Sequence, residues 1–268
     1  MSMTQWLRTP KGYVMISMIA FLLIAAVYSL DLRGVLNSFI AVGVSVTADF
    51  ICASLAKKKR AFPDGAIISG LIIALILSTR TSWYVVAATA LIAISSKYLL
   101  VYKKKPIFNP AAFGLLASIL LFRTGQSWWG AFGDLPAWTN VILLIGGYMI
   151  TNRVNKFPIV FSYLGTYFML LLIMGFFNIG DSSDALRSPF INATLFFAFF
   201  MLTDPPTTPA KDKDQFIFGI LSAVIGAVVY GIFGGLMYLF VGLLVGNLYQ
   251  YTLKRLTVSS SKTAGIRS

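Results

Sequence analysis

The sequence contains no histidine and no glutamate, and Cys52 is its only cysteine. Proteins hold zinc with a set of His, Cys or carboxylate ligands, iron–sulfur clusters with several thiolates, and haem with an axial His, Met or Cys. A single cysteine also makes a disulfide within the chain impossible. Redox chemistry carried by this chain alone would therefore need an organic cofactor.

Charged residues are scarce as well. They make up 12% of the 268 residues, against roughly a quarter in typical soluble domains. In contrast, 57% of the residues are hydrophobic, and the mean hydropathy is +0.80. A soluble core of this length cannot hide so much apolar surface, so most of it must face lipid or other buried helices. The composition predicts an all-α integral membrane protein.

Apolar segments recur along nearly the whole chain. About twenty helical residues cross a hydrocarbon core about 30 Å thick. The first segment is long, and no A-x-A-like cleavage site follows it, so we expect an anchor and not a signal peptide. The ten predicted transmembrane segments are residues 13–30, 35–56, 65–79, 83–102, 110–122, 139–152, 158–177, 190–203, 215–233 and 234–252.

The basic residues predict the orientation of these segments. If the N-terminus lies inside, 18 of the 22 lysines and arginines fall in cytoplasmic stretches, and only Arg33, Arg80, Arg123 and Arg187 lie outside. The positive-inside rule then places both termini in the cytoplasm and the protein in the inner (cytoplasmic) membrane of the cell. The net charge of +13 is explained by topology and contact with anionic lipids, without nucleic acid.

Three segments, 65–79, 110–122 and 190–203, are too short to span a bilayer easily, since such helices are only about 20 Å long. Residues 63–66 align with residues 190–193 at a constant offset of 127. The third helices of two five-helix halves are thus related. Because each half has an odd number of helices, five, the two halves must have opposite orientations in the membrane. Short segments at matching positions of such inverted halves indicate a binding site near the midplane.

We therefore predict a first five-helix repeat at 1–123 and a second, inverted repeat at 139–257. An extracytoplasmic connection at 124–138 would join them. The Ser-rich, basic tail at 258–268 is predicted to be disordered.

Asn109-Pro110 is a strong signal for a helix start. Asn is a favoured N-cap, and proline suits the first helical turn. The pair could simply start a helix at the cytoplasmic boundary, with Lys103, Lys104 and Lys105 in the headgroups. Alternatively, the helix start could lie below the surface and face a polar ligand with the positive end of its dipole.

Four blocks of sequence, in this order, resemble one known family. The F-N-P-A block is a weak signal alone, but its combination with the last block is specific. The blocks are similar to those of the RnfD component of the Rnf electron-transport complex and the NqrB component of the sodium-pumping NADH:quinone oxidoreductase. The resemblance implies two inverted repeats, similar in plan to urea transporters, and flavin cofactors on an electron path. The blocks are D-G-A-I-I-S-G-L-I-I-A-L (64–75), S-K-Y-L (96–99), F-N-P-A (108–111) and A-T-L-F-F-A-F-F-M-L-T-D-P-P-T-T-P (193–209).

One feature of the family is missing. Members with covalent FMN attach it through the threonine of a D-x-x-S/T-x-A-T motif between the two halves, and residues 124–138 contain no such motif. Asn192-Ala193-Thr194 echoes its ending, but the residue six positions before Thr194 is Ser188 and not aspartate. Any flavin, whether riboflavin or FMN, is therefore expected to be bound noncovalently.

The resemblance also implies a set of cofactor-binding residues between the repeats, with no catalytic residue and no metal ligand among them. Asn109 and Asn192 would cap the short helices and contact the flavin. Lys97 would lie near the edge of the flavin that gains negative charge on reduction. The predicted site residues are Lys97, Asn109, Asn192, Thr194, Thr203, Asp204 and Asn247.

Three of the polar residues also have simpler explanations. Lys97 could snorkel to the headgroups along its own side chain. Asp49, within a predicted helix, could be a structural carboxylate with a partner or part of a proton or cation path. Asp204 could belong only to a helix end set by Pro205.

The predicted function is that of a membrane electron-transfer protein within a larger complex, without its own NADH or iron–sulfur site. It would pass electrons to or from other membrane or flavin-carrying redox subunits. The alternative is a transporter or channel for a small solute that uses the same midplane site.

The predicted topology can be tested by cysteine labelling in a Cys52→Ala background. A Ser127→Cys variant should react with an impermeant thiol reagent from the outside, because the connection at 124–138 is predicted to be extracytoplasmic. A Ser260→Cys variant, near the C-terminus, is the matched control and should react only after the membrane is opened. Labelling of Ser127→Cys from the cytoplasmic side alone would overturn the assignment.

Overall fold

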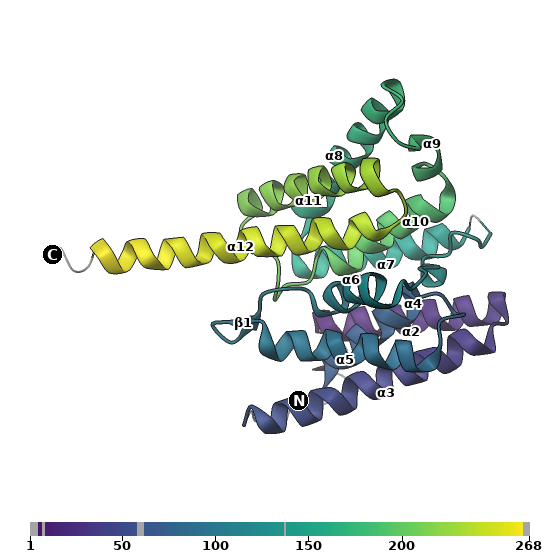
Figure 1. The fold of residues 1–268 in the computed structure, drawn as a ribbon, viewed down its shortest axis with the longest axis horizontal. Coiled ribbons are helices and arrows are strands. Elements are labelled where there is room, and N and C mark those ends of the chain that lie inside the picture. The colour runs from purple at the N-terminus through teal and green to yellow at the C-terminus, as the bar shows by residue number, and fades with distance from the viewer. Residues whose placement is uncertain (1–4, 7–8, 58–61, 137, 265–268) are drawn as a thin grey trace.

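The computed structural model of the protein describes residues 5–6, 9–57, 62–136 and 138–264. Each of the ten predicted apolar segments coincides with a helix (Figure 1). In chain order they are α2 (Pro10–Ser29), α3 (Leu32–Leu55), α4 (Asp64–Ile76), α5 (Trp83–Leu99), α6 (Pro110–Phe122), α7 (Thr139–Val154), α8 (Phe157–Phe176), α10 (Ser188–Phe196) with its π-helical continuation η2 (Phe197–Met201), α11 (Asp212–Phe233) and α12 (Met237–Ala264).

Four of these helices are long and apolar enough to cross a membrane: α2, α3, α8 and α11. Helices α4, α5, α6 and the α10–η2 unit are apolar but shorter. Large hydrophobic side chains such as Leu23, Phe39 and Phe176 are exposed on the outer surface. Such side chains would be costly in water, so the prediction of an all-α, multi-pass membrane protein is confirmed.

Close helix packing in both halves depends on small residues. A Cβ added at Gly70 of α4 would lie 2.8 Å from the Cα of Val42 in α3. A Cβ added at Gly242 of α12 would lie 2.4 Å from the carbonyl oxygen of Ser222 in α11. The backbones therefore touch at these positions, as is common where apolar helices associate without a hydrophobic driving force between them.

The short helix α4 ends inside the protein. Residues 71–77 are all buried, so the carbonyl groups at its end cannot bond to water. These carbonyl groups accept hydrogen bonds from the segment after α6. This segment includes η1 (Trp129–Ala131), a single 3₁₀ turn. The backbone N–H groups of Ser127 and Trp128 donate to the carbonyl of Ile76 at 3.0 and 3.1 Å, and Trp129 Nε1 donates to the carbonyl of Ala74 at 2.7 Å. The connection between the halves is thus part of the core.

The remaining short elements were not predicted from the sequence. A hairpin of β1 (Val101–Tyr102) and β2 (Lys105–Pro106) follows α5, and α9 (Ser182–Ala185) lies between α8 and α10. Lys103 and Lys104 form the hairpin turn with φ of 48° and 66°. Positive φ at both central residues is the geometry of a type I′ turn, which glycine or asparagine usually provides.

The end of the chain also differs from the prediction. Disorder was expected from Val258, but α12 continues to Ala264, and Figure 1 shows it reaching beyond the other helices. No proline or glycine stands between Asn247 and Ala264, so nothing in this stretch forces the helix to stop. Residues 265–268 of the predicted tail lie outside the described residues.

The bond from Trp129 to the end of α4 predicts a measurable effect on stability. A Trp129→Phe substitution keeps a ring but leaves the carbonyl of Ala74 without this donor, which should lower the free energy of unfolding by about 1–3 kcal/mol. Chemical denaturation in mild detergent measures the change. Trp138→Phe is the control, because Trp138 is 52% exposed and its loss should cost less than about 0.5 kcal/mol. Equal effects of the two substitutions would contradict the role of Trp129.

Candidate functional site

A cavity of about 660 Å³ lies where several helix ends meet. We call it the α4–α6 cavity. Its wall is formed by Trp6 and the first turn of α2, the first turns of α4 and α6, Lys97 near the end of α5, the hairpin residues 104–106, and residues 203–206. Four of the seven predicted site residues, Lys97, Asn109, Thr203 and Asp204, line this one cavity.

Asn109 connects the two halves of the chain at this cavity. Its Oδ1 accepts a hydrogen bond from the backbone N–H of Ala112 at 3.1 Å, which confirms the predicted N-cap of α6. Its own backbone N–H donates to Oδ1 of Asn247 in α12 at 2.9 Å, and Asn247 Nδ2 donates to the carbonyl of Thr207 at 3.1 Å. Both asparagines are buried. Asn247 therefore supports Asn109 from behind and does not line the α4–α6 cavity.

The T-D-P block forms a compact turn at the end of η2. Thr203 Oγ1 donates to the carbonyl of Phe199 at 2.6 Å, and Thr207 Oγ1 donates to Asp204 Oδ2 at 2.8 Å. Thr208 Oγ1 donates to the carbonyl of Asp204 at 2.7 Å. Pro205 follows directly, as expected for a helix stop, and the turn holds the Asp204 carboxylate at the cavity wall.

Burial raises the pKa of the Asp204 carboxyl above its usual value, and the hydrogen bond from Thr207 and the nearby lysines only partly offset this. One of these lysines is Lys156, which is 3% exposed and lies at the start of α8. Lys156 donates to the carbonyl of Pro209 and so fastens the end of the same loop. Burial lowers the pKa of Lys156 to about 8, so at neutral pH its ammonium group stays mostly charged.

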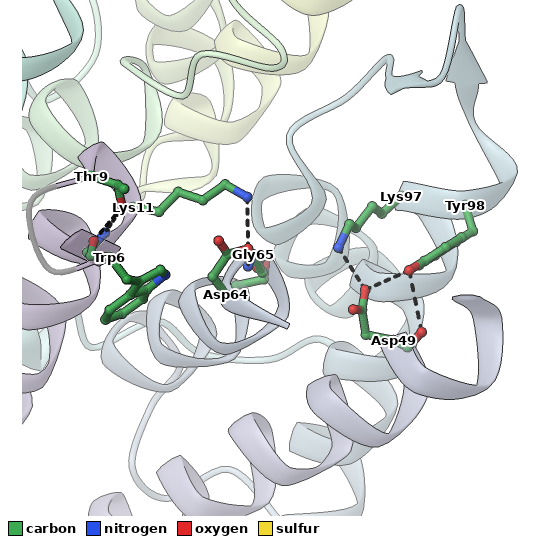
Figure 2. A network of polar contacts seen from close by, with 10 residues as sticks. Trp6, Thr9, Lys11, Asp49, Asp64, Gly65, Lys97 and Tyr98 are labelled. Atoms are coloured by element: carbon green, nitrogen blue, oxygen red, sulfur yellow. Dashed lines mark hydrogen bonds and ion pairs between the residues drawn. The ribbon is translucent and has the colours of Figure 1, made fainter. Parts of the chain in front are cut away.

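Lys97 is held by an ion pair across two helices (Figure 2). Its Nζ lies 2.7 Å from Oδ1 of Asp49 in α3, and Tyr98 Oη donates to the same oxygen at 3.0 Å. The ammonium group is therefore paired within the protein, and the alternative that it snorkels to the headgroups stays open. Asp49 is the structural carboxylate with a partner that the sequence allowed. A second pair, between Lys11 and Asp64 at 2.8 Å, lies nearer the solvent (Figure 2).

The balance of charge in the cavity wall is positive. Among the described residues, four lysines (Lys11, Lys97, Lys104 and Lys105) face two carboxylates, Asp64 and Asp204. The first turns of α4 and α6 add the positive ends of two helix dipoles. Trp6 belongs to the same wall, but its indole Nε1 is enclosed and has no hydrogen-bond partner in the described part of the chain. The cavity is suited to a polar ligand that carries negative charge and hydrogen-bond acceptors.

Two predicted site residues lie elsewhere. Asn192 Nδ2 donates to Oδ1 of Asn140 in α7 at 2.7 Å, and Thr194 Oγ1 and Tyr238 Oη are 2.8 Å apart. The prediction that Asn192 caps its helix is wrong. Helix α10 begins four residues earlier, at Ser188, because Pro189 favours the first turn of a helix.

Sequence reasoning missed several other residues of the wall. Lys11, Lys104 and Lys105 served only as evidence for the membrane orientation. For Lys104 and Lys105, their position directly before a capped helix was the signal that could have indicated a place in the cavity wall. Trp6 and Asp64 come from the starts of segments that are far apart in the chain. Only the packing of α2 against α4 brings them together.

The fold defines a multi-pass helical membrane protein, with a cavity between short helices whose largely apolar wall carries a few charged groups. A sequence profile of the NQR2, RnfD, RnfE family matches residues 7–135 and 118–261, which together cover most of the chain. The chain belongs to this family.

Curated relatives are named as the D component of an ion-translocating oxidoreductase complex. The protein from Shewanella amazonensis is 32% identical over 119 residues, which cover 42% of this chain and 30% of that protein. The proteins from Vibrio atlanticus and Aeromonas hydrophila are each 31% identical, over 118 and 129 residues, which cover 44% and 46% of this chain and 32% and 34% of the relatives. The aligned stretches span about a third of the length of these relatives.

The pair of Lys97 and Asp49 predicts a contrast between two carboxylates. Asp49→Asn removes the counter-charge of Lys97 at a site where the two side chains are 27% and 12% exposed, and should lower the free energy of unfolding by about 1–3 kcal/mol. Asp64→Asn is the matched control. The partner of Asp64, Lys11, has a side chain that is 54% exposed. Asp64→Asn should therefore lower the free energy of unfolding by less than about 1 kcal/mol.

Chemical denaturation in mild detergent measures both variants. The double variant Asp49→Asn/Lys97→Gln should recover part of the loss, because no unpaired charge remains. A double variant as unstable as the sum of its two single variants would show that the pair is not coupled.

Proposed function

We propose that this protein is a membrane electron-transfer subunit that holds a flavin noncovalently in the α4–α6 cavity. Membership in the NQR2, RnfD, RnfE family supports a redox role, since the relatives are named as components of an ion-translocating oxidoreductase complex. Other subunits of such a complex would be its redox partners. The chain would act at the cytoplasmic membrane with both termini inside, as the distribution of basic residues predicts.

The observation that carries this proposal is the match between the cavity wall and the needs of a flavin. The volume of about 660 Å³ lies within the range of about 300–1,000 Å³ typical of ligand sites. Trp6 and Phe200 add aromatic surface to the wall. Gly65 at the start of α4 also lines the cavity, and a Cβ added there would lie 3.6 Å from Lys97 Nζ, so the start of α4 and this ammonium group are neighbours in the wall.

The wall residues would have distinct roles. A bound flavin would supply the electron-transfer chemistry, and this chain would bind and orient it. Lys97 would stabilise the negative charge that arrives on reduction, and the ion pair with Asp49 would fix the position of its ammonium group. Asn109 would hold the start of α6 against the ligand, and Thr203 and Asp204 would form the opposite edge.

Noncovalent binding follows from the missing attachment motif at 124–138. The threonine that most resembles an attachment residue, Thr194, lies outside the cavity wall and against Tyr238. The proposal therefore assigns no flavin contact to Thr194 or to Asn192. It rests on the four predicted residues that line the cavity.

We also propose that the ten helices form two inverted repeats, with α2–α6 as one half and α7–α12, without α9, as the other. The equivalent helices pack in each half: α3 against α5 corresponds to α8 against α11, and α5 against α6 corresponds to α11 against α12. The two fifth helices, α6 and α12, also pack against each other. Their contact at Asn109 and Asn247 lies next to the cavity, as expected for a site between repeats.

Transport of a small solute is the second candidate. The short helices around a polar cavity favour it, because such helices are typical of transporters built from inverted repeats. Against it, residues 71–76 of α4 are buried and the end of the helix is closed by Trp128 and Trp129. A solute would need that seal to open.

The flavin proposal predicts that two variants of the cavity wall lose the ligand. Lys97→Ala removes a charged contact to a buried ligand, and Asn109→Ala removes the cap that holds the start of α6 against it. The loss of such a contact costs about 1–3 kcal/mol, or roughly ten- to a hundred-fold in affinity. Lys97→Ala should also lower the flavin midpoint potential, because the reduced form loses its counter-charge. Bound flavin per protein and the potential are measured at matched expression.

Asn192→Ala is the matched control, because it removes an asparagine with a side-chain partner of its own outside the cavity. It should keep its flavin. If wild type binds flavin and Asn109→Ala and Lys97→Ala retain it at unchanged occupancy and potential, the cavity is not the site.

A further inference from the structure

A second cavity, of about 550 Å³, lies between the β1–β2 hairpin, residues 206–207 and α12. We call it the hairpin cavity. Lys105, Pro106 and Pro206 line both cavities and form the wall between them. The α4–α6 cavity is lined by helix starts, whereas the hairpin cavity is lined by the hairpin and by residues 247–254 of α12. Figure 1 shows the hairpin and the outer part of α12 on the same side of the molecule.

The hairpin cavity has an excess of positive charge. Lys103, Lys105 and Lys254 line it, and Asp214 is the only acidic residue that the described chain places in its wall. Lys103 Nζ lies over the ring of Tyr102 at 5.6 Å. Within the part of the chain that the structure describes, Lys105 and Lys254 form no ion pair.

Burial and the repulsion of Lys105 lower the pKa of Lys254. Lys105 and Lys254 line the same cavity, and no described carboxylate pairs with either of them. An anion bound in the cavity would offset the repulsion between the ammonium groups of Lys105 and Lys254.

An amide side chain in the cavity wall points to the same kind of ligand. Gln250 is 9% exposed and lines the cavity, yet its side chain has no hydrogen-bond partner among the described residues. The neighbouring Asn247, in contrast, is fully engaged with Asn109 and Thr207. The amide atoms of Gln250 are not enclosed by the protein, so they can donate to an acceptor inside the cavity. The rings of Tyr102 and Tyr251, 5.2 Å apart and edge to face, form one side of the cavity.

We propose that the hairpin cavity binds the phosphate group of an anionic phospholipid. Its lysines belong to the stretches predicted to lie at the cytoplasmic headgroups, and basic pockets between helices at this level suit acidic lipid headgroups. Lys103, Lys105 and Lys254 supply the charge, and Gln250 donates a hydrogen bond to a phosphate oxygen. Lys103, Gln250 and Lys254 line only the hairpin cavity, so a test on these residues does not depend on the flavin proposal.

Native mass spectrometry of protein released from vesicles tests the site. The vesicles contain phosphatidylcholine mixed with phosphatidylglycerol, and the retained lipids are counted. Wild type should retain phosphatidylglycerol in preference to phosphatidylcholine. A Lys103→Gln/Lys254→Gln variant should lower this retention about fivefold for each lysine removed. Gln250→Ala should lower it without any change of charge.

The control is Lys211→Gln/Lys213→Gln, which removes the same charge from two lysines outside the walls of both cavities. It should retain the lipid as wild type does. An equal loss in this control, or the absence of a preference for phosphatidylglycerol in wild type, would overturn the lipid assignment.

Inorganic phosphate and FMN are added in separate samples to distinguish the source of the phosphate. Displacement of the lipid by either one, dependent on Lys254, supports a phosphate site that also accepts soluble ligands. If neither the lipid nor these probes bind better to wild type than to the Lys103→Gln/Lys254→Gln variant, the proposal is wrong.

Discussion

The structure depends on a constraint that lipid imposes on short helices. A helix that ends inside an apolar bundle leaves backbone groups that neither lipid nor water can pair, so the protein itself must supply partners. Helix α4 obtains them from the segment after α6, through the N–H groups of Ser127 and Trp128 and the indole of Trp129. Helix α6 obtains its cap from Asn109. Each of these partners comes from a place where the chain turns back into the core.

The same requirement joins the two halves. The backbone N–H of Asn109 is paired by Asn247 of α12, and Asn247 in turn holds the carbonyl of Thr207 in the T-D-P turn. Three blocks that are distant in the sequence thus form one polar unit, in which Asn109 lines the α4–α6 cavity while Asn247 and Thr207 line the hairpin cavity. Around this unit the lysines and the first turns of α4 and α6 give the cavity wall its positive character. The proposed flavin site rests on the residues of this wall.

The helices could be predicted well from the sequence, because their signals are local. Apolar length predicted the ten segments, and the Asn109-Pro110 pair predicted the start of α6. The prediction that Asn192 is an N-cap failed because a polar residue shortly after a proline resembles a cap. In the structure, Pro189 already lies in the first turn of α10. The helical end of α12 was missed because composition alone does not show whether a preceding helix continues.

Contacts between helices were harder to predict. Asp49 and Lys97 each needed a partner, yet nothing in their spacing of 48 residues shows that they are partners. The indole of Trp129, which meets α4 across 55 residues, had no signal in the sequence either. The composition of the cavity wall depends on such long-range contacts, and so four of the seven predicted residues line it while three do not.

The visible absorption spectrum of the wild-type protein tests the central claim most directly. The protein is purified from membranes in mild detergent, and the spectrum is recorded before and after denaturation and removal of small molecules. The account predicts a flavin spectrum in the native sample that leaves the polypeptide on denaturation. Flavin that stays on the denatured chain would contradict noncovalent binding, and a native protein without flavin would contradict the electron-transfer function.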